Sequence, residues 1–553
     1  MAKPENMFPT TWTTLWTDAI NTGTWRSATP VYQHRLSPCH SSCPVDGAIP
    51  AWMELMRKGE LHESWLKLVA NNPFPSVTGR VCHHPCEESC NRAYLDEKIS
   101  IKLLERYVSD LALEKDWSLP EKEAPKKHTI AVIGGGPAGL SAAYHLTLKG
   151  YKVEIFEAHK QVGGLMRYGI PPYRLPRKIL DQEIDRLLQT GIKVHNGSYI
   201  DGADDYMRLQ KQFDVIFISI GAQRSKELPQ IANIPGVVMD GLDFLFHFNS
   251  GDLPAVGRNV IVVGGGNTAV DAARVARRLG AEKVTIAYRR TEEQMPCQEI
   301  EILEAREEGI EFLFLVSPVK IESSNGLSKL VLQKMVLGEN DASGRPRPEP
   351  VKDAYFSFEV DNVIVAVGTE PALPSLNENL TVNDSLLKVD ESQKTELEGV
   401  FAGGDLTSME RYVSSALGSG KKAAESIALS FGYGSTEPDF QGGEVYSEEI
   451  NTFYFPIKPG ITHSSLAVPE RINNFKEVQH GLSEEQAFQE AERCFICGQC
   501  IICDNCFYYC PDMAVQKNGL EGEEYLILEQ YCKGCGLCVK ECPRGVIALR
   551  EEI

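Results

Sequence analysis

Short runs of apolar, mostly β-branched residues alternate with segments of helical periodicity through the middle of the chain. The run Thr129–Ile133 passes through a glycine-rich turn into a helix that extends to Lys149, and a second apolar run follows at 152–156. Further runs of this kind are found at 214–222, 259–263, 283–288, 362–369 and 399–405. Strands that alternate with helices usually pair side by side in parallel sheets. The pattern therefore predicts an α/β core that contains the same strand–helix–strand unit twice.

The two ends of the chain have other patterns. Near the N-terminus, apolar spacing predicts one helix over 49–68 and another over 97–113, followed by a charged linker that contains proline. Near the C-terminus, an irregular stretch precedes Ser483-Glu484-Glu485-Gln486, a capping box that should open a short helix. We predict an N-terminal arm that docks on another surface (1–38), a helical domain (39–125), a first α/β domain in two parts (126–244 and 371–434), an inserted second α/β domain (245–370), an extended linker (435–482) and a C-terminal domain (483–553).

Each strand–helix–strand unit carries a glycine-rich dinucleotide fingerprint. The first comprises Gly134, Gly136, Pro137, Ala138 and Gly139, with Glu157 at the end of the second strand. The second comprises Gly264, Gly266, Asn267, Thr268 and Ala269, with Arg289 and Arg290 in place of the acid. Glycines let the backbone approach a pyrophosphate at the helix N-terminus, and the acid accepts from a ribose hydroxyl. A guanidinium instead suits a 2′-phosphate, so the second unit predicts NADPH binding.

Composition and charge narrow the class of protein. The chain has 553 residues, 42% of them apolar, and a formal net charge of −20, which argues against nucleic acid or an anionic membrane as the partner. No apolar run approaches the roughly 20 residues that span a bilayer, and the N-terminal residues do not read as a secretion signal. We therefore expect a cytoplasmic protein, without a membrane span.

Cysteines are the densest chemical signal. Cys500, Cys503, Cys506 and Cys510 are followed by a proline and have the spacing of a bacterial [4Fe-4S] ligand run, and Cys532, Cys535, Cys538 and Cys542 repeat it. In such pairs of runs the fourth cysteine ligates the other cluster, so Cys542 should join the first set and Cys510 the second. Cys39, Cys43, Cys82, Cys86, Cys90, Cys494 and Cys497 remain to be explained, whereas Cys297 is expected to be a packed small hydrophobe.

The two nested dinucleotide units, Gly163-Gly164 after the acid, and the segment Gly399–Asp405 together resemble the flavoproteins with two dinucleotide-binding domains. That resemblance implies FAD at the first unit, with Gly163, Gly164, Gly221, Gly404 and Asp405 also at the cofactor, and NADP(H) at the second, with Gly368 there or at an inter-domain contact. No C-x2-C or C-x4-C pair lies beside Gly164, so we expect no disulfide next to the flavin.

Several motifs narrow the resemblance to one family. Cys43-Pro44-Val45, Gly79-Arg80-Val81-Cys82, the stretch Pro85–Cys90 and Tyr288-Arg289-Arg290-Thr291 resemble the small (β) subunit family of glutamate synthase. The same unit occurs in the large subunit of NADH-dependent ferredoxin:NADP oxidoreductase and in the N-terminal part of dihydropyrimidine dehydrogenase. The resemblance implies a helical iron–sulfur domain and two Rossmann-like domains, and the two C-terminal cysteine runs add a bacterial ferredoxin-like α+β domain beyond the family core.

The resemblance also implies two clusters in the N-terminal domain. One would use Cys43, Cys82 and Cys86 with Glu105, since a carboxylate can ligate iron. The other would use Cys39 and Cys90 with a C-x2-C pair just upstream, which this chain lacks. We hypothesise that Cys494 and Cys497 replace that pair, either from the same chain or from a second one, which gives four [4Fe-4S] clusters in all.

These modules predict an oxidoreductase in which FAD takes a hydride from NADPH and electrons pass singly through the clusters, or the reverse, with no catalytic side chain. No domain for an organic substrate is left over, so we expect an oligomeric complex with ferredoxin or a separate catalytic subunit. Three alternatives stay open: the NADP-reactive subunit of an electron-bifurcating transhydrogenase, hydrogenase or formate dehydrogenase complex; a glutamate synthase small subunit; and a non-catalytic redox sensor or scaffold.

Overall fold

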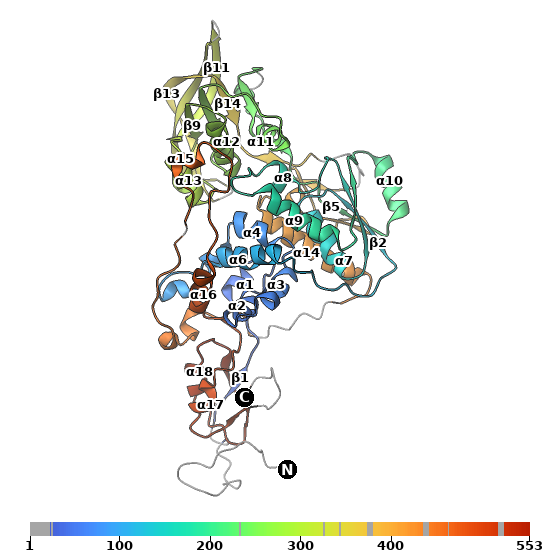
Figure 1. Cartoon of the computed structure of the whole chain (residues 1–553), viewed down its shortest axis with the longest axis vertical. Coiled ribbons are helices and arrows are strands. Elements are labelled where there is room, and N and C mark those ends of the chain that lie inside the picture. Colours follow the sequence, from blue (N-terminus) through green and yellow to red (C-terminus); the bar gives the residue numbers. More distant parts are fainter. Residues whose placement is uncertain are drawn as a thin grey trace.

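A computed structural model describes Gly23 and residues 26–231, 234–324, 327–341, 344–372, 380–434, 442–462, 464–517 and 525–552. Most of the predicted N-terminal arm and part of the predicted linker lie outside these residues. Figure 1 shows an elongated molecule in which the second α/β domain lies at one end, the first α/β domain lies beside a helical domain in the middle, and the C-terminal domain lies at the other end.

Two five-stranded parallel sheets form the α/β core. The first sheet has the order β18 (Val400–Ala402), β5 (Val215–Ile218), β2 (Thr129–Ile133), β3 (Lys152–Glu157) and β4 (Lys193–Asn196). The second has the order β10 (Glu311–Phe314), β9 (Lys283–Tyr288), β8 (Asn259–Val263), β14 (Asn362–Val365) and β7 (Val238–Asp240). Because β18 returns to the first sheet after the second is complete, one domain is inserted in the other, as the sequence predicted.

Helices cover both sheets. The first domain has α7 (Pro137–Leu148), α8 (Leu165–Tyr168), α9 (Arg177–Leu188), α10 (Ala203–Gln212) and α14 (Val413–Ser430). The second has α11 (Gly241–Ser250), α12 (Asn267–Arg278) and α13 (Glu299–Glu307). The boundary predicted at 244/245 falls inside α11, because β7 already pairs in parallel with β14 of the second sheet.

An antiparallel layer in the second domain was not predicted. It contains β11 (Val316–Ser324), β12 (Leu327–Asn340) and β13 (Pro346–Val360). Leu330 and Leu332 are buried in the same apolar cluster as Ile261 of the parallel sheet. This layer therefore backs the second sheet. Short strand pairs complete the two domains: β6 (Arg224–Ser225) with β15 (Thr369–Glu370), and β16 (Val382–Asn383) with β17 (Leu386–Leu387).

The helical domain contains α1 (Pro38–Ser41), α2 (Ile49–Arg57), α3 (Leu61–Val69), α4 (Pro75–Val81), α5 (Pro85–Glu88) and α6 (Ile101–Glu114). The single helix expected over 49–68 is two helices, and this expectation was wrong. The chain reverses at Gly59, whose φ of +78° is a left-handed conformation that glycine adopts without strain. Trp52, Trp65 and Leu104 pack in the core between α2, α3 and α6.

The two ends of the chain meet in the C-terminal domain. Its elements are α16 (Glu484–Arg493), α17 (Asn505–Tyr508), β19 (Val515–Gln516), β20 (Leu526–Ile527), α18 (Leu537–Lys540) and β21 (Ile547–Glu551), with the short α15 (Val468–Arg471) in the linker before it. Strand β1 (Ala28–Tyr32) pairs antiparallel with β21. The described part of the predicted arm therefore docks on its own chain. The predicted capping box is confirmed, since Ser483 Oγ accepts from Gln486 N at the start of α16.

Candidate functional site

The first glycine loop opens a cavity of about 450 Å³ at the carboxyl end of the first sheet. Gly134 has a φ of +100°, and a Cβ on Gly139 would stand 2.0 Å from the Gly134 carbonyl oxygen, so both positions need glycine. Gly136 caps α7 without a side-chain hydrogen bond, which leaves the N–H groups of the first turn to face the cavity. Uncapped N–H groups at the positive end of a helix fit a pyrophosphate. The volume is in the range of cofactor pockets.

Glu157 is buried beside this loop, at the end of β3. Its Oε2 accepts from Gly135 N at 2.8 Å, and its Oε1 accepts from His159 N at 2.8 Å. Each carboxylate oxygen has a second lone pair, so Glu157 holds the loop and keeps the capacity to accept from a ribose hydroxyl, a role that stays a prediction. Gly163 N donates to Gly135 O at 2.7 Å, and the neighbouring Gly164 lines the cavity.

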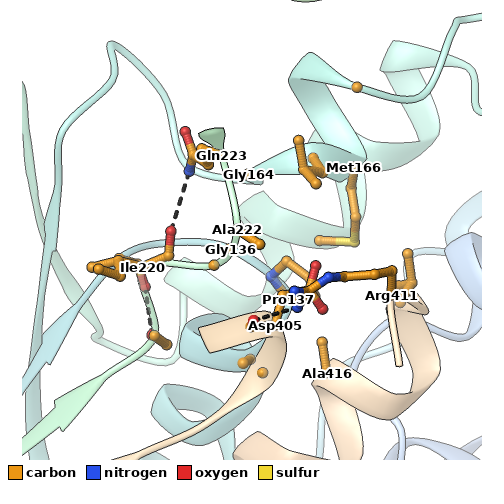
Figure 2. Close-up of a pocket in the computed structure, with 18 of the residues that line it drawn as sticks. Gly136, Pro137, Gly164, Met166, Ile220, Ala222, Gln223, Asp405, Arg411 and Ala416 are labelled. Atoms are coloured by element: carbon orange, nitrogen blue, oxygen red, sulfur yellow. Dashed lines mark hydrogen bonds between the residues drawn. The ribbon is translucent and has the colours of Figure 1, made fainter. Parts of the chain in front are cut away.

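Another part of the wall comes from the segment after β18. Figure 2 shows Asp405 and the end of the Arg411 side chain close to Pro137, with Met166 above them. Burial raises the pKa of the Asp405 carboxyl to about 6, and the Arg411 guanidinium opposes this shift. An Arg411 N–H donates to the Asp405 carbonyl oxygen. Gly404 and Gly221, both with a φ of +71°, also line the cavity.

The second glycine loop opens a larger cavity of about 970 Å³. Gly266 caps α12 without a side-chain hydrogen bond, which again leaves helix N–H groups available for phosphate. Gly264, with a φ of +146°, and Gly368, with a φ of +117°, line this cavity. Asn267, Thr268 and the arginines after β9 line it as well, whereas Ala269 is buried behind the loop.

Three of the arginines that line this cavity, Arg289, Arg290 and Arg345, differ in what they can bind. Arg290 is buried, and its guanidinium pairs with Asp341 Oδ2 at 2.6 Å and donates to Pro346 O at 2.8 Å. Arg289 is exposed at the cavity, and Arg345 lies close enough to lower the pKa of Arg289, after burial and Arg290. Of the two arginines after β9, Arg289 is therefore the one that is exposed at the cavity, which Arg345 also lines, while Arg290 holds the antiparallel layer.

The two cavities adjoin. Asn267, Thr268, Arg411 and Tyr412 line both of them. Val81 and His83 line the first cavity as well. The His83 ring packs against the Tyr412 ring in a tilted arrangement, with ring centroids 4.1 Å apart and planes at 43°, and its Nε2 lies 3.2 Å from Asn267 Nδ2. Because Val81 and His83 flank Cys82, the first cavity borders both the second one and the cysteines of the helical domain.

One group of predicted cluster ligands lies next to the wall that Val81 and His83 form in the first cavity. Burial raises the pKa of the Cys43 thiol to about 12, with Glu105 and Cys82 among the charges that add to it. Cys43 and Cys82 likewise raise the pKa of Cys86, after burial. The Glu105 carboxyl accepts from Asn72 Nδ2 at 2.7 Å and Thr78 Oγ1 at 3.0 Å, and burial raises its pKa to about 8. The structure thus brings Cys43, Cys82, Cys86 and Glu105 together.

A second group joins the two ends of the chain. The pKa of Cys39 is raised mainly by burial. The neighbouring thiols raise it further, Cys90 most, then Cys497 and Cys494. Burial raises the pKa of Cys494 to about 11 and that of Cys497 to about 12, with Cys90 contributing to both. The structure therefore gathers Cys39, Cys90, Cys494 and Cys497 within one chain.

The C-terminal cysteines lie in two neighbouring sets. Burial raises the pKa of Cys506 to about 12, with Cys500, Cys503 and Cys542 adding to it. Burial likewise raises the pKa of Cys538 to about 12, with Cys510, Cys532, Cys506 and Cys535 adding to it. Cys542 thus lies with the first run and Cys510 with the second. The contribution of Cys506 to the second set shows that the two sets are neighbours.

These groups suit iron–sulfur clusters. None of the sixteen cysteines forms a disulfide, and backbone N–H groups donate to the sulfurs of Cys82, Cys494, Cys510 and Cys532. Hydrogen bonds to sulfur orient ligands and tune cluster potentials. Within the described ranges, no three His, Cys, Asp or Glu side chains are close enough to bind a single metal ion. A four-iron cluster is larger than one ion and holds its ligands farther apart.

Some residues at the site were not predicted. Arg411 and Tyr412 come from the loop after Asp405, and His83 from a segment noted only for its cysteines. Arg345 follows a stretch with no motif. Arg411 and Tyr412 follow Asp405 closely in the sequence, which could have suggested that they lie at the same site. Only the fold brings Arg345 close to Arg289. Cys297 is half-buried against the core of the second domain, as expected.

Comparison with known proteins agrees with this architecture, which defines a flavoprotein oxidoreductase with two dinucleotide-binding domains. The chain belongs to the family described as pyridine nucleotide-disulphide oxidoreductase, which it matches over residues 128–424. Residues 22–117 match the "Dihydroprymidine dehydrogenase domain II, 4Fe-4S cluster" family, and residues 525–548 match the "4Fe-4S binding domain" family.

Three relatives show how far the similarity extends. The chain is 35% identical over 503 residues to the NADPH-Fe(3+) oxidoreductase subunit beta of Geobacter sulfurreducens, covering 83% of this chain and 75% of the relative. It is 35% identical over 499 residues to the NADP(+)-dependent formate dehydrogenase subunit beta of Moorella thermoacetica, covering 83% and 70%. It is 31% identical over 410 residues to the glutamate synthase [NADPH] small chain of Azospirillum brasilense, covering 70% and 85%.

The predicted resemblance to the glutamate synthase small-subunit family is thus confirmed, and the chain is an NAD(P)H-dependent iron–sulfur flavoprotein oxidoreductase. Its cofactors are FAD, a nicotinamide dinucleotide and [4Fe-4S] clusters. Among the described residues, no helix combines the length and the apolar character needed to cross a membrane.

Proposed function

We propose that the chain is the NADPH-reactive subunit of a multi-subunit oxidoreductase and exchanges electrons with a separate catalytic subunit or a ferredoxin. The observation that carries this proposal is the order of the sites. The nucleotide cavity adjoins the flavin cavity, the flavin cavity borders Cys82, and cysteine groups continue from there to the C-terminal domain. Bound in the first cavity, FAD would accept a hydride from the nicotinamide and release its electrons singly, which clusters require.

The side chains of the cavities position the cofactors and supply no acid or base. Asn267, Thr268, Arg411 and Tyr412 form the shared wall and define where the two rings can meet. Glu157 anchors the first glycine loop, and Asp405 lies where the ribityl and phosphate part of a flavin would come. Arg289 and Arg345 select the 2′-phosphate, which supports NADPH over NADH.

The cysteine groups support four clusters. Cys43, Cys82 and Cys86 with Glu105 would hold the one nearest the flavin, and Cys39, Cys90, Cys494 and Cys497 the next. The last two would be held by Cys500, Cys503 and Cys506 with Cys542, and by Cys532, Cys535 and Cys538 with Cys510. Cys503 and Cys535 are exposed, so the C-terminal pair is where a partner can approach.

The names of the relatives support a partner subunit. Two of them are beta subunits, one of an NADPH-Fe(3+) oxidoreductase and one of an NADP(+)-dependent formate dehydrogenase. The third, a glutamate synthase small chain, aligns over 410 residues and leaves part of this chain unmatched. These similarities favour an electron-transfer subunit with an added outlet domain. The predicted cytoplasmic location and the predicted FAD, NADPH and cluster ligands stay predictions.

The test is reduction of a viologen dye by NADPH, catalysed by the chain purified without oxygen and with its flavin and iron contents measured. We expect NADPH-dependent dye reduction by the chain alone. A preparation with full flavin and iron that fails to reduce the dye would instead support a sensor or scaffold. Co-purification under the same conditions identifies the partner: a subunit that oxidises formate or evolves hydrogen points to a bifurcating complex, and an amidotransferase points to glutamate synthase.

A further inference from the structure

Arg544 is a buried arginine that has no carboxylate partner within the described part of the chain. It is 5% exposed. Every other buried arginine in the described residues forms an ion pair with an aspartate or glutamate: Arg35, Arg80, Arg92, Arg106, Arg167, Arg274, Arg290, Arg471 and Arg493. A buried charge is costly without a counter-charge. Arg544 therefore needs a negative group that the carboxylates do not provide.

The groups around Arg544 belong to the loop that carries Cys494 and Cys497. An Arg544 N–H donates to the Phe495 carbonyl oxygen, and the Arg544 carbonyl accepts from Gly498 N at 2.8 Å. The guanidinium lies 4.9 Å from the centroid of the Phe455 ring, and its Nε has no hydrogen-bond partner in the described residues. Arg544 is thus fixed against this loop with a donor left over.

Among the groups near Arg544, the thiols of Cys494 and Cys497 are the ones that can supply a negative charge to balance it. Arg544 binds the backbone of Phe495 and Gly498, which directly follow Cys494 and Cys497 in the chain, and Glu54 is the carboxylate whose charge also acts on it. Glu54 already pairs with Arg57 at 3.2 Å and with Lys58 at 3.6 Å. Since the thiols are neutral when protonated, they can balance Arg544 only as thiolates, the form in which cysteines ligate iron.

We propose that the Arg544 guanidinium is the buried counter-charge of an iron–sulfur cluster held by Cys39, Cys90, Cys494 and Cys497, and that it raises the reduction potential of that cluster. This inference rests on the four-thiol site proposed above. A cluster with four thiolate ligands carries net negative charge, and its reduction adds one more. A fixed cation beside it stabilises the reduced form more than the oxidised form.

The position of Arg544 in the chain adds a consequence. It follows Pro543 and Cys542, and Cys542 lies with the outer group of Cys500, Cys503 and Cys506. Arg544 thus contacts the loop of Cys494 and Cys497 and is two residues from Cys542, which lies with Cys500, Cys503 and Cys506. A raised potential at the inner site makes electron transfer into it from the flavin side more favourable.

The experiment is a redox titration monitored by electron paramagnetic resonance, with iron content, on the full chain and its Arg544→Gln and Arg544→Lys variants. Arg544→Gln should keep its iron and lower the equilibrium constant for reduction of one cluster by about tenfold or more, which is about 59 mV for one electron. Arg544→Lys keeps the charge and should shift the potential by much less. Arg471→Gln, a buried arginine paired with Glu307, is the matched control and should leave every cluster potential unchanged.

The other possible results of this titration also either support or contradict the proposed role of Arg544. If Arg544→Gln loses one cluster and Arg544→Lys retains it, the charge holds the cluster and the inference stands. If Arg544→Gln keeps full iron with unchanged potentials, or if both variants shift or lose the cluster equally, Arg544 acts only as a hydrogen-bond clamp and the inference is wrong. Failure of the four-thiol site itself is distinguishable, because Cys494→Ala would then retain the iron content of the parent chain.

Discussion

An Arg289→Ala variant should lose much of its preference for NADPH over NADH. Arg289 lines the nucleotide cavity after β9, at the position where the acid of a NAD-binding unit would stand, and Arg345 lies beside it. A hydrogen bond between charged groups contributes about 1.5–3 kcal/mol. Because Arg289 is exposed, we take the lower end, ~1.5 kcal/mol, which is about a tenfold change in binding.

The KM for NADPH should therefore rise about tenfold in Arg289→Ala and about a hundredfold when Arg345→Ala is added, if the two contributions are independent. The KM for NADH should stay unchanged, because NADH has no 2′-phosphate. The assay is steady-state dye reduction with each nucleotide, on preparations matched in flavin and iron. An unchanged ratio of the two KM values in the double variant would refute the assignment of these arginines.

Arg290→Ala provides the contrast within the same motif. Its guanidinium is buried and paired with Asp341, which is 30% exposed. The variant should lose stability by somewhat less than the roughly 3–5 kcal/mol of a fully buried pair. Its nucleotide preference should be the same as that of the parent chain. A selective loss of NADPH binding with normal thermal stability would show that Arg290, not Arg289, binds the phosphate.

Three further predictions concern other parts of the chain. Cys494→Ala should lose the iron of one four-iron cluster, measured as iron and acid-labile sulfide per chain; an unchanged content contradicts the site shared by the two ends. His83→Ala removes the contacts with Asn267 and Tyr412 and should slow cluster reduction severalfold relative to flavin reduction in stopped-flow spectra, with iron content unchanged; equal rates would show that His83 only fills space. Burial raises the pKa of the Glu183 carboxyl from 4.5 to about 7, so the folded chain holds this proton more tightly and stability falls as pH rises from about 4.5 to 7. Glu183→Gln should remove that part of the pH dependence of the thermal midpoint, and parallel curves for the two proteins would show that the shift is absent.

The sequence was a good guide wherever a local rule was sufficient. The glycines of both loops and the acid at 157 depend on neighbours within a single strand–helix unit, and the capping box at Ser483 depends on residues within one turn of a helix. Gly59 shows the limit of periodicity, because the apolar spacing continues across it and only the backbone conformation shows the break. The antiparallel layer was missed because its strands pack on the second sheet, and no motif marks that contact.

The candidate site divides in the same way. Spacing alone assigned Cys510 to the set of the second run and Cys542 to the set of the first, since the rule for paired ferredoxin runs needs only the positions of the cysteines in the sequence. Whether Cys494 and Cys497 meet Cys39 in one chain could not be read from the sequence, because the meeting depends on how β1 reaches the C-terminal domain. Arg290 was taken as a phosphate ligand because its partner, Asp341, is about fifty positions away.

The pairing of β1 with β21 has a consequence for how the protein is made. Thr29 donates to Glu552, a residue 523 positions later in the chain. At the roughly 5–20 residues per second of ribosomal synthesis, β1 waits about 25–100 s for its partner, with an open strand edge that can pair with another chain. Assembly of the proposed cluster of Cys39, Cys90, Cys494 and Cys497 would likewise have to wait until Cys494 and Cys497 have been synthesised. Truncated chains would keep their Rossmann-like domains but leave the N-terminal strand as a site for aggregation or chaperone binding.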